Sequence, residues 1–306
     1  MLRELPRLTS QRADIDISPD KFGFLETSTH LLTDVAMMRQ RMASDGYLFF
    51  PGLLNQDEVL AARRTVATKL EALKLLDPDY DIMECIAAPS VAVGFLRELA
   101  MENPELMKVL YAGPMMSFFA LFFGEPALHF DYTWFRAISP GQGTPAHMDV
   151  VYMGRGTKRL YTAWTPIGDA TLELGGLMVL EGSHKHERLN NGYGTKDVDE
   201  FCENRVGKNF VKMGGGGNIR DGGALTYDMV TLRDRLGGRW LASDYQAGDV
   251  LIFSIYLVHG SLDNNSNRIR LSSDSRYQRA SEPVDHRWMG ANPIAHGPEG
   301  KRGMIC

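Results

Sequence analysis

The spacing of hydrophobic positions predicts helices in the first part of the chain, after a poorly periodic lead-in over residues 1–30. Asn55 followed by Glu58 is typical of a helix start. The segment Tyr47–Phe50 is short and continuously apolar, as a buried strand is, and a Pro-Gly pair closes it. We therefore predict a strand there and helices over residues 31–42, 56–76, 93–99 and 104–123.

After Pro126 the pattern changes to short runs of β-branched and aromatic residues, bounded by Gly, Pro, Asn or Asp. These runs do not alternate regularly with helices, so they favour a sandwich or barrel over a doubly wound parallel sheet. The fold class predicted is α+β, with a mainly β core and supporting N-terminal helices. The predicted strands are residues 127–138, 159–167, 177–181, 240–245, 250–258 and 269–277.

A polar, glycine-heavy insertion at about residues 187–239 interrupts the strand series and includes four consecutive glycines at 214–217. The glycine run does not fit the spacing of a phosphate-binding loop. Two interpretations stay open: a solvated insertion without a chemical task, and a mobile lid. We predict a single domain over residues 31–285 that carries this insertion, followed by a C-terminal tail over 286–306.

Composition narrows the class of protein. The chain has 306 residues, with 33 Lys+Arg against 38 Asp+Glu, and this net charge of -5 argues against a protein that coats nucleic acid or an anionic membrane. No stretch reaches about 18 uninterrupted apolar residues, and residues 1–20 lack the apolar stretch of a signal peptide. The three cysteines are far apart in the sequence and form no CxxC motif, so we expect them to be isolated reduced thiols. We expect a cytoplasmic protein with a small-molecule partner; the oligomeric state is not predicted.

Three residues could bind one metal ion. The segment PAHMD places His147 and Asp149 two positions apart, and on an extended chain such residues point to the same face. His259, at the end of an apolar strand, is available as a third ligand, and two imidazoles with one carboxylate suit non-haem Fe(II) and O₂ chemistry. His129 and Asp131 have the same spacing, but His129 lies in a run of large apolar residues, whereas His147 follows a PGQG turn. We therefore favour His147 and Asp149.

Arg270 follows His259 by eleven positions, in a strand-like run. Arg270 and Ser272 share one face of that run, so a guanidinium and a hydroxyl could together bind the carboxylate of a co-substrate. Arg268 has the same parity and Arg276 lies farther along, so both stay alternatives. Each of the three arginines could instead be an ordinary surface or ion-paired residue.

These segments resemble, in their order along the chain, the phytanoyl-CoA dioxygenase family of Fe(II)/2-oxoglutarate oxygenases. The resemblance covers about residues 45–277. It implies a double-stranded β-helix, that is, a cupin-like jelly roll, with supporting helices. The matching pieces are DGYLFFPG at residues 45–52, PGQGTPAHMD at 140–149, Trp164, LGGLMVLEGSHK at 174–185, Gly248-Asp249, His259-Gly260-Ser261 and Arg270.

The resemblance also implies the cofactor and the residues that bind it. It implies Fe(II) held by His147, Asp149 and His259, with 2-oxoglutarate and O₂ as co-substrates. Arg270 falls where the family's 2-oxoglutarate-binding arginine falls, which settles the preference over Arg268. Ser261 and Trp164 match positions that line the co-substrate pocket in relatives, and His184 matches a structural turn.

The expected reaction is oxidation of an unactivated C–H bond of a small metabolite. Asp149 stands where the family's halogenating members have a small residue, which favours hydroxylation-type chemistry. Tyr132, Trp134 and Arg136 share one face of the strand before the iron motif and are candidates for the substrate pocket, with core packing or solvent exposure as the competing interpretations. The alternative function is a non-catalytic β-helix binding module that retains the metal site. A Ser-His-Asp hydrolase is disfavoured because the chain has no GxSxG motif.

Overall fold

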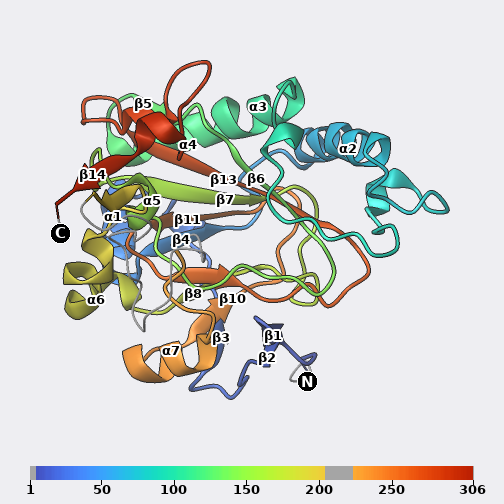
Figure 1. The fold of residues 1–306 in the computed structure, drawn as a ribbon, viewed down its shortest axis with the longest axis horizontal. Coiled ribbons are helices and arrows are strands. Elements are labelled where there is room, and N and C mark those ends of the chain that lie inside the picture. Colours follow the sequence, from blue (N-terminus) through green and yellow to red (C-terminus); the bar gives the residue numbers. More distant parts are fainter. Residues whose placement is uncertain (1–4, 204–222, 306) are drawn as a thin grey trace.

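Two facing β-sheets form the core of the molecule, in a computed structural model that describes residues 5–203 and 223–305. Figure 1 shows the sheets as separate layers, with β8 and β10 on one side of β7 and β11. The strands are β1 (Thr9–Ser10), β2 (Ala13–Asp14), β3 (Phe22–Phe24), β4 (Tyr47–Phe50), β5 (Ala127–His129), β6 (Trp134–Ile138), β7 (Tyr161–Pro166), β8 (Leu177–Leu180), β9 (Glu200–Cys202), β10 (Trp240–Ala242), β11 (Val250–Ser254), β12 (His259–Ser261), β13 (Arg270–Arg279) and β14 (Arg302–Met304).

The larger sheet has six strands in the order β4-β11-β7-β13-β5, and β6 pairs with β13 beside β5. Its pairings are antiparallel, and the register of β13 on β7 runs from Ser272 opposite Pro166 to Tyr277 opposite Tyr161. The smaller sheet has the order β12-β8-β10-β3. This pair of sheets confirms the predicted fold class, a double-stranded β-helix with supporting helices.

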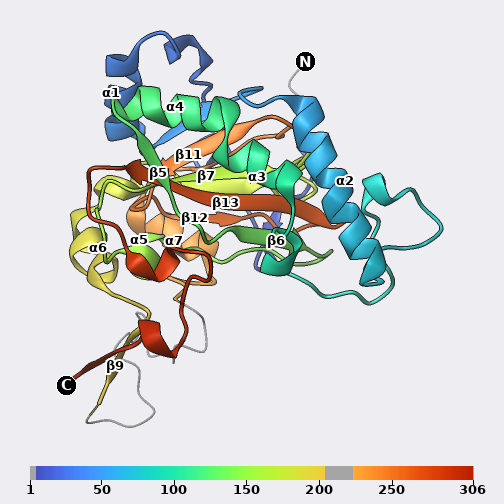
Figure 2. The same ribbon diagram turned by 90° about the horizontal axis from the view of Figure 1, so that it is seen from above.

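The helices of the N-terminal part of the chain cover the outer face of the larger sheet. Figure 2 shows α3 and α4 lying over this sheet, with α2 beside them. One hydrophobic cluster joins these helices to the larger sheet, and a second fills the space between the two sheets. A third cluster includes Met178, Leu180 and Trp240, which alternate with the residues of the second and therefore lie on the opposite face of the smaller sheet. The helices are α1 (Val35–Asp45), α2 (Gln56–Ala72), α3 (Pro104–Tyr111), α4 (Gly113–Phe123), α5 (Val150–Met153), α6 (Glu187–Asn191) and α7 (Met229–Leu236).

Strand β13 shows how the sequence produces a polar interior. Successive side chains of a strand point to opposite faces, so the odd-numbered residues form one row and the even-numbered residues the other. Leu271 and Tyr277 belong to the cluster under the helices, whereas Arg276, on the other face, reaches Asp149. The even-numbered row therefore points to the interior between the sheets and consists of Arg270, Ser272, Asp274, Arg276 and Gln278.

Three segments differ from the sequence prediction. Residues 93–96 are not helical, because they run beside β6, where Leu96 N donates to Phe135 O and Ala137 N donates to Gly94 O. The predicted strand 127–138 is broken between β5 and β6. The lead-in also contributes to the core, because β3 adds a parallel strand to β10. The glycine run at 214–217 lies outside the described residues.

One helical stretch, Pro104–Phe123, is long and apolar enough to cross a membrane, with a mean hydropathy of 1.6. Within the described residues it is divided into α3 and α4 at Ala112, which has an extended backbone. Both helices bury apolar residues in the hydrophobic cluster between the helices and the larger sheet. Core helices of soluble proteins have the same length and composition.

Candidate metal and co-substrate site

The structure brings His147 and His259 side by side at β12, the edge strand of the smaller sheet. Their backbones exchange two hydrogen bonds, with N···O distances of 2.9 and 3.0 Å, as opposed residues of an antiparallel pair do. Both residues are buried, and their ring centroids lie 4.1 Å apart. Two segments more than one hundred residues apart in sequence therefore place two imidazoles at one point.

Asp149 completes the group, although not by the strand geometry that the sequence suggested. Its backbone is helical, with φ -63° and ψ -25°, and it precedes the short helix α5. Its Oδ1 lies 4.0 Å from His147 Nε2 and 3.8 Å from His259 Nε2. The three candidate ligand atoms all lie within 4.8 Å of one another, a spacing at which one metal ion fits between them.

Hydrogen bonds on the far side of each ring set which nitrogen faces the centre. His147 Nδ1 donates to Pro145 O at 2.9 Å, and His259 Nδ1 donates to Leu257 O at 3.0 Å. Because a carbonyl oxygen can only accept, each Nδ1 carries the proton and each Nε2 keeps its lone pair. The Nε2 lone pairs of both rings therefore face the space beside Asp149 in which a metal ion could bind.

The protonation states suit a metal site at neutral pH. Burial, with repulsion from His259 and Arg136, lowers the pKa of His147 to about 3, and burial also lowers the pKa of His259. Burial opposes ionisation of Asp149, but Arg276 and the two imidazoles outweigh it and hold the pKa of this carboxyl well below its usual range. The group thus offers two neutral imidazoles and one carboxylate.

Two neighbours hold the carboxylate of Asp149. Thr162 on β7 donates its hydroxyl to Oδ2 at 2.5 Å, and Arg276 on β13 donates Nη2 to Oδ1 at 3.1 Å. The sequence named Arg276 only as a competitor for the co-substrate, and it gave no role to Thr162. The sequence did contain one indication of this position: residues 270 and 276 are an even number of positions apart, so on one strand both point to the inner face.

Arg270 lies buried on the same inner face with its Nε and Nη1 unpartnered by any described residue. The Ser272 hydroxyl and the Trp164 indole Nε1 are likewise buried without a partner. The Arg270 guanidinium lies 5.8 Å from the Trp164 ring. Buried donors without acceptors are costly, so this group of residues is suited to receive an anion.

The other candidates of the sequence analysis are placed differently. Arg268 pairs with Glu84 at 3.4 Å and is half exposed, so it points away from Arg270. Ser261 is buried in β12, where its Oγ accepts from Thr144 N at 2.8 Å. Unlike Ser272, Ser261 already has a protein partner.

A cavity of about 390 Å³ opens onto the metal-binding group. Tyr132, Trp134 and Arg136, the three predicted substrate residues, line its wall together with His147 and Asp149. Arg136 donates Nε to Asp274 at 2.7 Å, and its side chain keeps 22% of its surface exposed. The sequence analysis did not predict several further lining residues, among them Phe95, Tyr152, Tyr227 and His296, which come from distant segments.

The second HxD pair does not join this group. The His129 ring stacks on Tyr111 with centroids 4.2 Å apart, and its Nδ1 donates to Phe130 O. The Asp131 carboxylate accepts from Gly290 N at 2.6 Å. Neither side chain lines the cavity at the metal-binding group.

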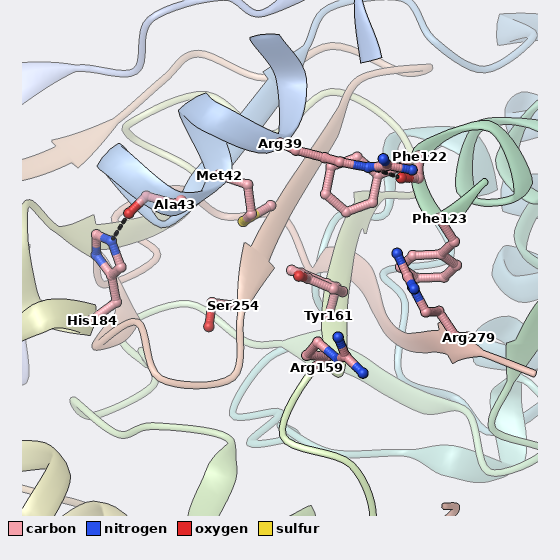
Figure 3. A pocket seen from close by; sticks show the side chains of 10 residues that line it. All are labelled: Arg39, Met42, Ala43, Phe122, Phe123, Arg159, Tyr161, His184, Ser254 and Arg279. Carbon is pink, nitrogen blue, oxygen red and sulfur yellow. Dashed lines mark hydrogen bonds between the residues drawn. The ribbon is translucent and has the colours of Figure 1, made fainter. Parts of the chain in front are cut away.

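A second cavity, of about 320 Å³, lies between α1, α4 and the ends of β7, β11 and β13, and Figure 3 shows its lining. No residue of the metal-binding group lines it. His184 bridges its wall to α1 by a hydrogen bond from Nε2 to Ala43 O at 3.2 Å. Gly46 is required here, because its φ is +80° and a Cβ would lie 2.6 Å from His184 Nδ1. His184 thus packs against α1, outside the metal-binding group.

The chain belongs to the phytanoyl-CoA dioxygenase (PhyH) family, whose model matches residues 42–272. Membership makes it an oxidoreductase of the class that uses non-haem iron, 2-oxoglutarate and O₂. Two relatives are each named 1-deoxypentalenic acid 11-beta-hydroxylase. The protein from Streptomyces arenae is 27% identical over 291 residues, with 92% of each chain covered, and that from Streptomyces exfoliatus is 28% identical over 282 residues, with 89% covered.

Solved structures share the fold. The carbocyclase SnoK from nogalamycin biosynthesis, described as non-heme and alpha-ketoglutarate dependent, superposes with a TM-score of 0.58 and 17% identity, over 89% of this chain and 93% of its own. The apoform of EctD from S. alaskensis gives a TM-score of 0.56 and 16% identity, over 97% and 98% of the two chains. At these identities the likeness concerns the fold alone.

Proposed function

We propose that this protein is a hydroxylase in which His147, Asp149 and His259 bind Fe(II) and Arg270 binds 2-oxoglutarate. The observation that carries the proposal is the convergence of two imidazole lone pairs and one carboxylate oxygen within 4.8 Å of one another. Such a donor set on one face of an octahedron leaves three positions open, as non-haem iron oxygenases require. The location that we propose for the enzyme is the cytoplasm.

The residues present fit both the metal and the co-substrate. The imidazoles are neutral, the carboxylate is ionised, and their outer hydrogen bonds fix their orientation. Arg270 and Ser272 offer buried donors that no described residue satisfies. A dicarboxylate satisfies them if its distal carboxylate meets the guanidinium fork, with Trp164 and Ser261 as further residues of this co-substrate pocket.

When bound, the iron would supply oxidation of a C–H bond by O₂, in which one oxygen atom enters the substrate as a hydroxyl group and the other enters succinate as 2-oxoglutarate loses CO₂. The chain's own tasks are positioning and exclusion of water. Arg270 fixes the far end of the co-substrate, which sets the direction from which its other end enters the cavity. The buried walls around His147 and His259 exclude bulk water from the reacting centre.

The substrate that we propose is a small, mostly apolar molecule that carries a polar or acidic group. Aromatic residues form much of the cavity wall, among them Tyr132 and Trp134, whose ring centroids lie 4.6 Å apart. Arg136 adds a cation. Its Nε donates to Asp274, whereas its two Nη atoms make no hydrogen bond within the described residues. The curated relatives are named for hydroxylation of a carboxylic acid, which supports this class of substrate.

Anaerobic titration tests the proposal. Protein loaded with Fe(II) should develop a weak visible charge-transfer band when 2-oxoglutarate is added, and it should release succinate in air. His147→Ala should lose both signals, whereas His129→Ala, the matched variant in the other HxD pair, should keep them. Unchanged iron binding in His147→Ala would show that the metal lies elsewhere. A wild-type protein that binds iron but neither develops the band nor releases succinate would support the alternative, a non-catalytic binding module that retains the metal site.

The substrate class is tested separately by a screen of small metabolites for stimulated succinate release, with 1-deoxypentalenic acid among the acids. Stimulation by apolar acids, but not by their methyl esters, is the expected result. Equal stimulation by acid and ester would contradict a role for Arg136 in binding an anionic group.

A further inference from the structure

The guanidinium of Arg276 is buried, with 2% of the residue exposed, beside the candidate metal ligands. Its Nη2 donates to Asp149 Oδ1, the same oxygen that faces both histidine Nε2 atoms. Its Nε lies 3.1 Å from Met153 Sδ, and its Nη1 is buried without a partner. The one anion that hydrogen-bonds to this cation within the described residues is therefore Asp149.

The nearest other carboxylate is already engaged. Asp274, two residues along β13, accepts from Arg136 Nε at 2.7 Å. On its other side, the Arg276 guanidinium lies 4.6 Å from the Trp134 ring, which excludes water from that face. Arg276 and Asp149 thus form a buried pair of opposite charges.

Thr162 and Arg276 divide the two oxygens of Asp149 between them. The two residues are opposite each other in the β7–β13 ladder. The Thr162 hydroxyl holds Oδ2, whereas the Arg276 guanidinium holds Oδ1. The contacts differ in kind, because Thr162 supplies orientation without charge and Arg276 supplies a full positive charge.

We propose that Arg276 is a positioning residue that takes the place of the metal's charge: it compensates the buried Asp149 carboxylate until a divalent cation binds at Oδ1. This inference rests on the proposed metal site. A buried carboxylate without a compensating cation is strongly destabilising, and either the guanidinium or the metal ion removes that cost. The metal-free protein can therefore keep its site folded, with Asp149 paired to Arg276.

The proposal predicts opposite effects for the two neighbours of Asp149. Arg276→Met should lower the melting temperature in EDTA by roughly 5–10 °C, because it leaves the carboxylate uncompensated. Saturating Fe(II) under anaerobic conditions, or Mn(II), should restore much of that loss, so that the metal-induced rise in melting temperature is larger than in the wild type. Arg276→Lys keeps the charge and should give a rise close to that of the wild type.

Thr162→Val should do the reverse, because it removes orientation but leaves the charge balance unchanged. We expect metal affinity to fall roughly ten- to hundredfold, with a smaller metal-induced rise in melting temperature. Matched controls lie on the same strands. Thr165→Val removes a buried hydroxyl that has no partner among the described residues, and Arg279→Met removes a partly exposed arginine near Glu282. Neither substitution should change the metal-induced rise.

The outcomes separate this inference from the proposed function. If Arg276→Met loses the same stability with and without metal, Arg276 serves packing alone and the inference is wrong. If the metal-induced rise in Arg276→Met is smaller than in the wild type, the guanidinium aids metal binding and does not substitute for its charge. If the wild type itself shows no metal-induced rise, the metal site is refuted, and the inference with it.

Discussion

At the scale of single residues, Arg270 shows how far chemistry can be inferred from sequence. Its spacing from His259 and its parity with Ser272 predicted an inward-facing anion-binding pair, and the structure places both residues on the buried inner face of β13. Burial and the nearby Arg136 lower the pKa of Arg270 to about 10, so the guanidinium stays protonated at neutral pH. Its role in binding the co-substrate stays a prediction.

Substitution of Arg270 tests that role. Arg270→Met should raise the KM for 2-oxoglutarate about ten- to hundredfold, the loss expected for a charge-assisted hydrogen bond. The melting temperature without co-substrate should stay unchanged or rise, since the substitution removes a buried cation whose Nε and Nη1 have no hydrogen-bond partner among the described residues. Steady-state succinate assays and thermal unfolding measure the two effects, with Arg268→Met as the control. A lower melting temperature with an unchanged KM would assign Arg270 to the core instead.

Asp149 shows what residue patterns could not predict. The i, i+2 argument assumed an extended chain, but Asp149 has a helical backbone and immediately precedes α5. Its contacts to Thr162 and Arg276 depend on this turn of the backbone and on the β7–β13 register. Such contacts join segments that no local pattern connects.

At the scale of secondary structure elements, the sequence predicted the type of most segments and was least accurate at their ends. Helix α2 begins at Gln56, as the Asn55 cap predicted, since the Asn55 side chain accepts from Glu58 N. The helix predicted at residues 93–99 was wrong over residues 93–96, because apolar spacing over so few residues fits an edge segment beside β6 equally well.

One aromatic contact joins helix α4 to the site-bearing strand β13. Phe119 is buried and stacks on Tyr277 of β13, with ring centroids 4.0 Å apart. Phe119→Ala should destabilise the protein by about 3–5 kcal/mol, through lost burial and the cavity that remains. Leu121→Ala, on the exposed side of the same helix, should change stability by no more than about 0.5 kcal/mol. Denaturant unfolding measures both, and equal losses would contradict the packing described.

At the scale of the whole molecule, both ends of the chain contribute to the site in ways that local patterns did not predict. In the lead-in, Ser10 Oγ donates to Ser261 O on β12, and Asp263 accepts from Gln11 N and Arg12 N. Figure 2 shows β9 and the C-terminal end extending together from the body. These contacts join residues that are more than 200 positions apart in the sequence, so the spacing of residues within one segment could not predict them.

A buried carboxylate attaches the tail to the insertion. Asp199 accepts from Arg287 Nη1 and Lys301 Nζ at 2.5 Å each, and from His296 Nδ1 at 2.9 Å. The attachment brings His296 into the wall of the substrate cavity. Whether the insertion acts as a lid stays a prediction, because residues 204–222 lie outside the described part of the chain.

The central claim is that a single iron atom lies between His147, Asp149 and His259. Anomalous diffraction at the iron edge, from crystals loaded anaerobically with Fe(II), tests it most directly. The account predicts one strong peak at about 2.0–2.3 Å from His147 Nε2, Asp149 Oδ1 and His259 Nε2. A peak beside His129 and Asp131, or no peak in crystals that contain stoichiometric iron, would contradict it.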